Sequence, residues 1–332
     1  MNLRRAAVLS LSLLTLSTLS ACTAETRSDE NVASSESALF FYRGFAWDLF
    51  GISLNGRGLN GNTLTGKGVL GVSYSGATLG KNELRSVWLE GTTLHATGPR
   101  AGMGGRALVG AVFSAKVIDG DTLPLRIDAV EASSNPMNRD LQLYTVSYQT
   151  DASWQPLCGT DAQGHAVRAI PLAGRWDYRS GVEGGGSHIE DPSMFTFACE
   201  GYAIAKCVDL GYRPLGDDKP CNGGGAGCSL MHLMDDMHQA CTRAMRADYC
   251  GDGTSYTHDA VTIDIYDGFG YRTPMKGWPF EAEWNAAGAV CANQPRVPPA
   301  GTPTCWSRLQ REGCGKASHF KTGTLLMSQI SP

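Results

Sequence analysis

The sequence predicts an α+β protein, with a short β-solenoid-like repeat, a β-rich region and a disulfide-rich domain of helices and strands. Three observations support this prediction. An apolar residue recurs at every fifth position between residues 54 and 94, residues 107–178 carry strand and turn signals, and ten of the eleven cysteines lie between residues 158 and 314. A chain of 332 residues can bury a substantial core, and we expect two domains.

Residues 1–21 have the composition of a signal peptide. Arg4 and Arg5 precede an apolar run over residues 6–19, which is too short to span a membrane. The run ends in Leu19-Ser20-Ala21-Cys22, which resembles the lipobox of bacterial lipoproteins.

This resemblance implies cleavage before Cys22 and lipidation, palmitate included, of its thiol and its new amino group. Thr23 favours the outer membrane over the inner by resemblance to lipoprotein sorting. We therefore expect a lipoprotein of the cell envelope that is bound to the outer membrane through its lipid anchor. The alternative is an ordinary signal peptide, with Cys22 as one more thiol.

Residues 22–50 are expected to contain the lipidated cysteine, a tether and an apolar cap. Residues 23–38 are polar and lack aromatic side chains, as is typical of a solvated linker. Residues 39–50 are abruptly apolar and aromatic, so they are expected to form a first strand or to cover the end of the following segment.

Residues 51–98 contain a repeat of period five. Positions 54, 59, 64, 69, 74, 79, 84, 89 and 94 are all apolar or aromatic, and glycine stands two positions after six of these nine. Neither a helix nor a flat strand has this period, whereas a pentad can form one side of a β-solenoid coil. The pattern resembles the pentapeptide-repeat family, but larger residues replace its usual small residue in the first five pentads (Ile52, Arg57, Asn62, Lys67 and Val72). The alternative is a glycine-rich linker.

Residues 99–332 are expected to combine a β-rich region with a cysteine-rich domain that begins near residue 158. Residues 122–128 and 141–148 have the composition of strands, which favours a meander or a small sandwich. Two helices are predicted after them. The segment 195–210 is apolar nearly all round and should be buried, whereas 229–246 has a single apolar stripe.

The cysteines predict a disulfide framework in an oxidising compartment. Assigning Cys22 to the lipid leaves an even number, as such a framework requires. These ten are Cys158, Cys199, Cys207, Cys221, Cys228, Cys241, Cys250, Cys291, Cys305 and Cys314.

The charge balance argues against nucleic acid as a partner. Cleavage before Cys22 removes Arg4 and Arg5, so the mature chain has 26 basic and 32 acidic residues, a net charge of −6, and no basic run. Nucleotide binding is not expected either, because a P-loop-like segment at 61–68 has Gly68 where the magnesium-binding hydroxyl belongs. The expected partners are the membrane and an unidentified protein or glycan.

The C-terminal half carries a distinctive block, Arg246-Ala-Asp-Tyr-Cys-Gly-Asp-Gly253, followed by an apolar strand at 261–267. With Ala240-Cys241 before it and Trp278 to Trp284 after it, this block resembles the ADYC domain of bacterial secreted proteins. The resemblance covers about the C-terminal half of the chain, and it implies no reaction that can be carried over to these residues.

Two catalytic or metal-binding alternatives can be drawn from the residue types. Cys250, His258 and Asp259 are the types found in a thiol nucleophile, its base and an orienting acid, although a disulfide at Cys250 is the simpler interpretation. On the second predicted helix, a cluster of two histidines and two aspartates suggests a metal site, but a solvated polar face explains it better (His232, Asp235, Asp236 and His238).

The third alternative is a calcium-binding loop, which would make Ca²⁺ a cofactor of the protein. Counted from Asp248, acids stand at positions one, five and twelve (Asp248, Asp252 and Asp259), with Gly253 at six, as in an EF-hand loop. Position three is Cys250, however, and a strand is predicted to follow where an EF-hand has a helix. The simpler interpretation is a turn in which Asp248 and Asp252 bond backbone amides.

These observations favour a lipid-anchored, disulfide-rich envelope protein with a structural or binding role and no catalytic residues. A secreted hydrolase and a calcium-stabilised binding module are the alternatives. Polar groups converging in a pocket around Asp248, His258 and Asp264 would favour the hydrolase.

Overall fold

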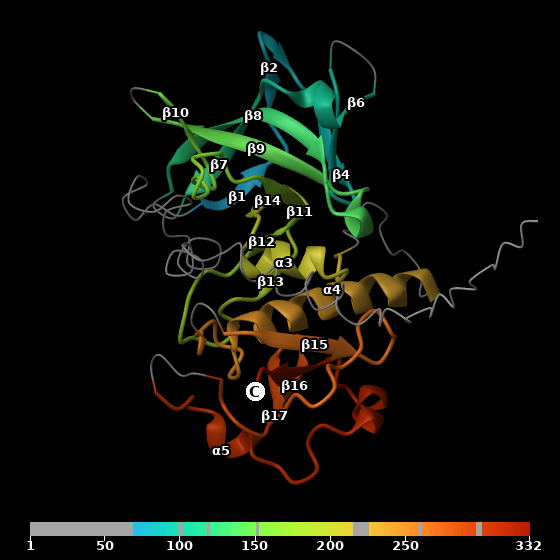
Figure 1. Ribbon diagram of the computed structural model, residues 1–332. Coiled ribbons are helices and arrows are strands. Elements are labelled where there is room, and N and C mark those ends of the chain that lie inside the picture. The colour runs from blue at the N-terminus through green and yellow to red at the C-terminus, as the bar shows by residue number, and fades with distance from the viewer. Residues whose placement is uncertain are drawn as a thin grey trace, which may run out of the picture.

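The computed structural model describes residues 69–98, 102–117, 120–150, 153–214, 226–257, 261–296 and 301–332, with residues 226–232 described by their backbone alone. The signal segment, Cys22, the tether, the cap and the pentads before Val69 lie outside these ranges. Figure 1 shows a barrel at one end, two helices beneath it, and a second sheet beyond the helices.

The β-rich region is a closed barrel of six antiparallel strands. They are β1 (Val69–Ser73), β14 (Met194–Cys199), β11 (Ala169–Ala173), β9 (Gln142–Gln149), β8 (Thr122–Ala132) and β7 (Ala111–Val117), in that order around the wall. The wall closes because β1 pairs with β14 at Val72 and Phe195 and with β7 at Val72 and Ala115. Closure removes the free strand edges that the expected meander or sandwich would have left.

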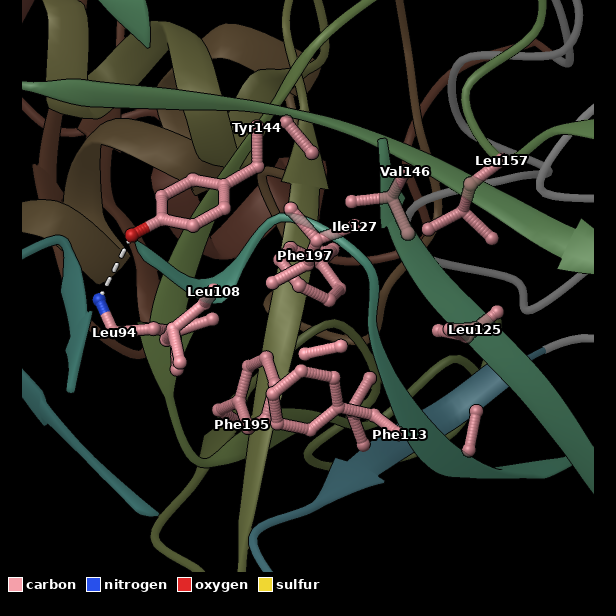
Figure 2. Packing of buried hydrophobic residues seen from close by; sticks show 14 of the residues in the cluster. Leu94, Leu108, Phe113, Leu125, Ile127, Tyr144, Val146, Leu157, Phe195 and Phe197 are labelled. Carbon is pink, nitrogen blue, oxygen red and sulfur yellow. Dashed lines mark hydrogen bonds between the residues drawn. The ribbon is translucent and has the colours of Figure 1, made fainter. Parts of the chain in front are cut away.

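Side chains fill the interior of the barrel. Alternate residues along the strands point inward and are almost fully buried, among them Phe113, Leu125, Ile127, Val146, Phe195 and Phe197 (Figure 2). A barrel this narrow has room for side chains alone. Cys158 and Cys199 form a disulfide, with both residues buried.

The described part of the five-residue repeat does not form a solenoid. Short strands β2 (Thr78–Leu79) and β3 (Asn82–Glu83) extend the barrel at β7, while β4 (Ser86–Glu90), β5 (Thr93–Thr97) and β6 (Met103–Gly104) form a small antiparallel sheet. Leu84, Leu89 and Leu94 are all buried. The periodic residues therefore face the core, but they do so from hairpins, because turns such as the one at Gly91 (φ 59°) reverse the chain.

A tyrosine ties this small sheet to the barrel. The hydroxyl of Tyr144, on β9, accepts a hydrogen bond of 2.9 Å from the backbone N–H of Leu94, on β5 (Figure 2). Both residues have no exposed surface, so this bond fixes the sheet within the same core as the barrel.

The first predicted helix is wrong over its N-terminal half. Residues 194–199 are β14, and α3 covers only Ala203–Asp209. Two aromatic residues flank Thr196, a composition that favours a strand, and Gly201, at φ 90°, turns the chain before the helix starts. The second predicted helix is confirmed as α4 (Ala226–Arg246).

The C-terminal sheet is antiparallel and lies against α4. Its strands are, in order, β15 (Ile263–Asp267), β18 (Leu326–Ile330), β16 (Phe280–Asn285) and β17 (Gly288–Ala292), so the strand predicted at 261–267 is confirmed. The apolar stripe of α4, including Met237, Cys241 and Ala244, packs in one cluster with Ile265 and Trp284. α4 also contacts α3, and the disulfide Cys207–Cys241 joins the two helices.

Short elements complete the described chain: β10 (Trp154–Pro156), β12 (Arg175–Trp176), β13 (His188–Ile189), α5 (Trp306–Leu309) and the 3₁₀ helices η3 (Gly105–Leu108), η4 (Pro136–Asn138) and η5 (Ala317–Lys321). None of the helices in the described ranges combines the length and apolar character needed to cross a bilayer.

Candidate functional site

The family-like block lies where α4 ends and the chain turns toward the C-terminal sheet. Ala247 has φ 52° and is fully buried. This left-handed residue ends the helix, and the N–H of Asp248 then donates to the carbonyl of Arg243 at 2.9 Å. A larger side chain would have to fit a crowded and strained position, which explains the alanine in the block.

Asp248 is the centre of the site. Its side chain has no exposed surface and forms ion pairs with Arg243 and, at 3.8 Å, with Arg246. One carboxylate oxygen accepts the N–H of Asp252 at 3.2 Å, and the other accepts the N–H of Gly253 at 3.0 Å. Both oxygens of the carboxylate therefore have partners inside the fold.

The two arginines connect Asp248 to neighbouring loops. Arg243 donates to the carbonyls of Gly185 and Ala286 and to the hydroxyl of Ser187, and Arg246 donates to the carbonyl of Gly253 at 2.7 Å. Burial lowers the pKa of Arg246 to about 10, against the opposing effect of Asp248, so the guanidinium stays charged at neutral pH. The buried charges are thus compensated by one carboxylate and several carbonyl dipoles.

The glycines of the block allow other backbone segments to approach closely. A Cβ on Gly251 would lie 1.7 Å from the carbonyl oxygen of Ala287, and one on Gly253 would lie 2.3 Å from that of Arg179. Both glycines also have positive φ, at 70° and 81°. These positions exclude any side chain, and they seat the block between two other turns of the fold.

Tyr249 and Cys250 attach the block to the C-terminal sheet. The hydroxyl of Tyr249 donates to Glu281 at 2.7 Å and accepts the N–H of Arg296 at 2.6 Å, and its ring stacks on Trp284 at 5.2 Å. Burial, with the nearby negative charge of Glu281, raises the pKa of Tyr249 far above its usual range. Cys250 is bonded to Cys305.

Four disulfides join described cysteines: Cys158–Cys199, Cys207–Cys241, Cys250–Cys305 and Cys291–Cys314. They account for eight of the ten cysteines assigned to a disulfide framework. Cys221 lies outside the described residues, and Cys228 lies in the part of α4 described by its backbone alone. The lipid site predicted at Cys22 also lies outside them.

The structure does not show the catalytic group suggested by Cys250, His258 and Asp259. Cys250 is in a disulfide, and His258 and Asp259 lie outside the described residues. Asp264 is also separate from Asp248 in its bonding, because its carboxylate accepts the N–H of Met275 at 3.1 Å and lies 3.8 Å from Arg272.

Asp248 and Asp252, two of the residues proposed to bind calcium, instead bond backbone amides in a turn. Asp248 bonds two backbone amides as well as the arginines, and Asp252 accepts the N–H of Thr254 at 2.9 Å. Asp259, the third proposed ligand, lies outside the described residues. The part of the loop that is described is a turn pinned by side-chain to backbone bonds.

The predicted polar face of α4 is wrong at His238. This residue is buried, and its Nε2 donates to the carbonyl of Ile204 at 3.0 Å. Asp236 is exposed and Asp235 partly exposed, while the side chain of His232 is not described. Because α3 covers this side of α4, the histidine lies in a helix interface and not in water.

Sequence reasoning missed the buried charges of the C-terminal sheet. Glu281 forms an ion pair with Arg296 at 2.8 Å, and Glu283 accepts hydrogen bonds from three groups. Both glutamates are at most 1 % exposed. The signal was the order Phe280-Glu-Ala-Glu-Trp284, in which two acids stand within an otherwise apolar strand.

Within the described ranges, one set of donor atoms has the types that hold a metal: Glu283, Cys291 and Cys314. The two sulfurs are bonded to each other, so in this oxidised state they are not metal ligands. The barrel holds a cavity of about 10 Å³ lined by apolar groups such as Val72, Leu125 and Phe197, no larger than one water molecule needs.

Comparison with known proteins gives one match. The model of the ADYC domain family matches residues 105–298, which is more than half of the chain. Neither a curated protein nor a solved structure matches it.

Proposed function

The chain belongs to the ADYC domain family, and we propose that it is a lipid-anchored protein of the cell envelope with a structural or binding role. The observation that supports the structural or binding role is the burial of Asp248. A catalytic acid or a metal ligand must be reached by substrate or ion, whereas this carboxylate has no exposed surface and bonds two arginines and two amides. The family block therefore joins α4, the loop at 185–187 and the C-terminal sheet.

The filled barrel supports the same conclusion. Ligand pockets commonly have volumes of about 300–1,000 Å³, whereas the cavity lined by Val72, Leu125 and Phe197 has about 10 Å³. A partner, whether a protein or a glycan, would therefore be bound at the outer surface and not inside the barrel.

The proposed anchor is Cys22, followed by the tether at 23–38. Membrane fractionation and mass spectrometry of the N-terminal peptide test it. We expect the wild-type protein in the outer-membrane fraction with an acylated N-terminal cysteine, and Cys22→Ser either in the soluble fraction or unprocessed. Ser28→Ala, a change within the tether, is the matched control and should fractionate as wild type. A soluble wild-type protein without lipid would contradict the proposal.

The hydrolase alternative requires polar groups that converge around Asp248, His258 and Asp264. Burial raises the pKa of the Asp264 carboxyl group, and groups with raised pKa values occur in active sites. We propose a structural role here too, because Asp264 accepts the Met275 N–H and so fixes the turn that follows β15. The test is hydrolysis of ester, peptide and glycoside substrates by the mature protein. Turnover that Asp264→Asn abolishes, while the melting temperature is kept, would overturn the structural role.

The calcium alternative is tested by the melting temperature in millimolar Ca²⁺. We expect no stabilisation, because the Asp248 carboxylate already has its partners. An increase in wild type that is absent in Asp252→Asn would establish a calcium-stabilised module instead.

A further inference from the structure

A buried carboxylate lies beside the disulfide between Cys291 and Cys314. Cys291 is on β17, and Cys314 precedes η5. A carboxylate oxygen of Glu283, on the adjacent strand β16, and the two sulfurs all lie within 4.8 Å of one another. Glu283 is 1 % exposed, so this acid faces the disulfide from inside the protein.

Glu283 is connected to the surface through His319. The Nδ1 atom of His319 lies 2.7 Å from one carboxylate oxygen, which also accepts the N–H of Gly315 at 2.6 Å. The other oxygen accepts the hydroxyl of Thr324 at 2.7 Å. The His319 side chain is 32 % exposed, so the pair gives a route for a proton between water and the neighbourhood of the sulfurs.

The two cysteines differ in accessibility. Cys291 is buried and Cys314 is partly exposed. Thiol–disulfide exchange requires an attacking thiolate to reach one sulfur and the other sulfur to leave. Cys314 is suited to be attacked, and Cys291, which lies deeper, is suited to leave.

The other described disulfides lack one or both of these features. Cys158–Cys199 and Cys207–Cys241 are buried at both ends. Cys250–Cys305 is partly exposed, but the polar groups recorded near its Cys250 sulfur are the N–H of Cys305 at 3.3 Å and the hydroxyl of Thr304 at 3.7 Å. The described set of donor atoms that contains a carboxylate does not include this disulfide. Accessibility alone therefore does not distinguish it from Cys291–Cys314, whereas the carboxylate does.

We propose that Cys291–Cys314 is a thiol–disulfide exchange site whose substrate is a dithiol, small or carried by another protein. A thiolate of the dithiol attacks Sγ of Cys314, a new S–S bond forms, and the Cys291–Cys314 bond breaks. The Cys291 sulfur leaves with the electron pair and takes a proton from the Glu283–His319 pair, which regains one from water through His319.

The second thiol of the substrate completes the exchange. Solvent first deprotonates this second thiol. The resulting thiolate attacks the substrate sulfur that is bonded to Cys314 in the mixed disulfide. Cys314 is released as a thiolate and is then protonated. The dithiol is oxidised to a disulfide, and Cys291 and Cys314 are reduced to two thiols. In the reverse reaction, the reduced Cys291 and Cys314 thiols would reduce a disulfide of the partner and re-form the Cys291–Cys314 bond.

The experiment follows each disulfide of the full-length folded protein in low concentrations of dithiothreitol, the probe dithiol. Samples are quenched with acid, alkylated and mapped by mass spectrometry. We expect Cys291–Cys314 to open roughly tenfold or more faster than Cys250–Cys305, because of these two it is the one with the Glu283 carboxylate, linked to His319, beside its sulfurs. Equal rates, or earlier opening of Cys250–Cys305, would overturn the proposal.

Glu283→Gln tests the acid, and Glu281→Gln is its matched control. Glu281 is equally buried two residues earlier on β16, but it bonds Tyr249 and Arg296. We expect Glu283→Gln to slow opening of Cys291–Cys314 by roughly tenfold or more and Glu281→Gln not to slow it. Mere loosening of the fold would accelerate opening, so a decrease in rate identifies proton transfer. An unchanged or increased rate in Glu283→Gln would refute the role of the acid.

Discussion

The guanidinium group of Arg243 and the carboxylate of Asp248 form an ion pair that excludes water, at 2 % and 0 % side-chain exposure. The two residues lie on either side of the end of α4, and Arg243 also bonds the loop at Gly185 and Ser187. A buried pair of this kind does not by itself add much stability, but loss of one partner leaves the other charge buried and uncompensated.

The first prediction concerns this pair. Arg243→Met should lower the free energy of unfolding by about 3–5 kcal/mol, because it leaves the buried Asp248 carboxylate without its main partner. Urea denaturation followed by fluorescence measures this change. Arg179→Met is the control, because Arg179 pairs with Asp177 while its side chain is 70 % exposed, and the expected loss is below about 1 kcal/mol. Similar losses in both variants would show that burial does not set the strength of the Arg243 interaction.

The second prediction concerns the disulfide at the same turn. Cys250 should not react with an alkylating agent in the folded protein without reductant, because it is bonded to Cys305. Cys250→Ser should lower the free energy of unfolding by about 2–5 kcal/mol. Cys305→Ser should lose as much, and the double variant little more, because each removes the same bond. A free Cys250 thiol in the native protein would revive the thiol-nucleophile alternative.

Local signals in the sequence predicted part of this structure. The even cysteine count predicted disulfides, and the apolar stripe of the segment 229–246 predicted α4. The alternation at 122–128 predicted β8, and the β-branched and aromatic residues at 141–148 predicted β9. These features depend on neighbouring residues, so periodicity and composition detect them.

Features that depend on distant residues could not be predicted in this way. The barrel closes through β1, whose Val72 pairs with Phe195, and no local pattern specifies that partner. The sequence pattern places Arg243 on the polar side of α4. It is buried because loops distant in the chain, at Gly185 and Ala286, cover it and accept its hydrogen bonds. The five-residue period did place Leu84, Leu89 and Leu94 in the core, but hairpins satisfy that period here as a solenoid would have done.

The third prediction concerns His238 and acid. Burial between the helices lowers the pKa of His238 from 6.5 to about 4, and its Nε2 donates to the carbonyl of Ile204. Between these pH values the unfolded chain binds a proton that the folded protein does not bind. The free energy of unfolding should therefore decrease as pH falls from 6.5 to about 4, by roughly 3 kcal/mol from this residue.

The difference between wild type and His238→Gln isolates this contribution. It must be taken as a difference because Asp209, whose pKa burial raises to about 6, acts in the opposite direction over the same range. Glutamine can still donate to Ile204 but does not titrate. Urea denaturation at several pH values should show that the free energy of unfolding falls less steeply with decreasing pH in the variant than in wild type. If the two plots of free energy against pH were parallel, His238 would not be the residue responsible.

The last prediction concerns the repeat segment within the core. Leu89 is 2 % exposed on β4, and its backbone pairs with Leu94, the residue that bonds Tyr144. Leu89→Asp should therefore lower the free energy of unfolding by several kcal/mol, because it buries an unpaired carboxylate. Ser86→Asp is the control, since Ser86 is exposed on the same strand and the same charge there should have little effect. Protease protection of residues 69–98, read by mass spectrometry, should be lost in the first variant alone. Equal protection in both would mean that this segment contributes little to the core.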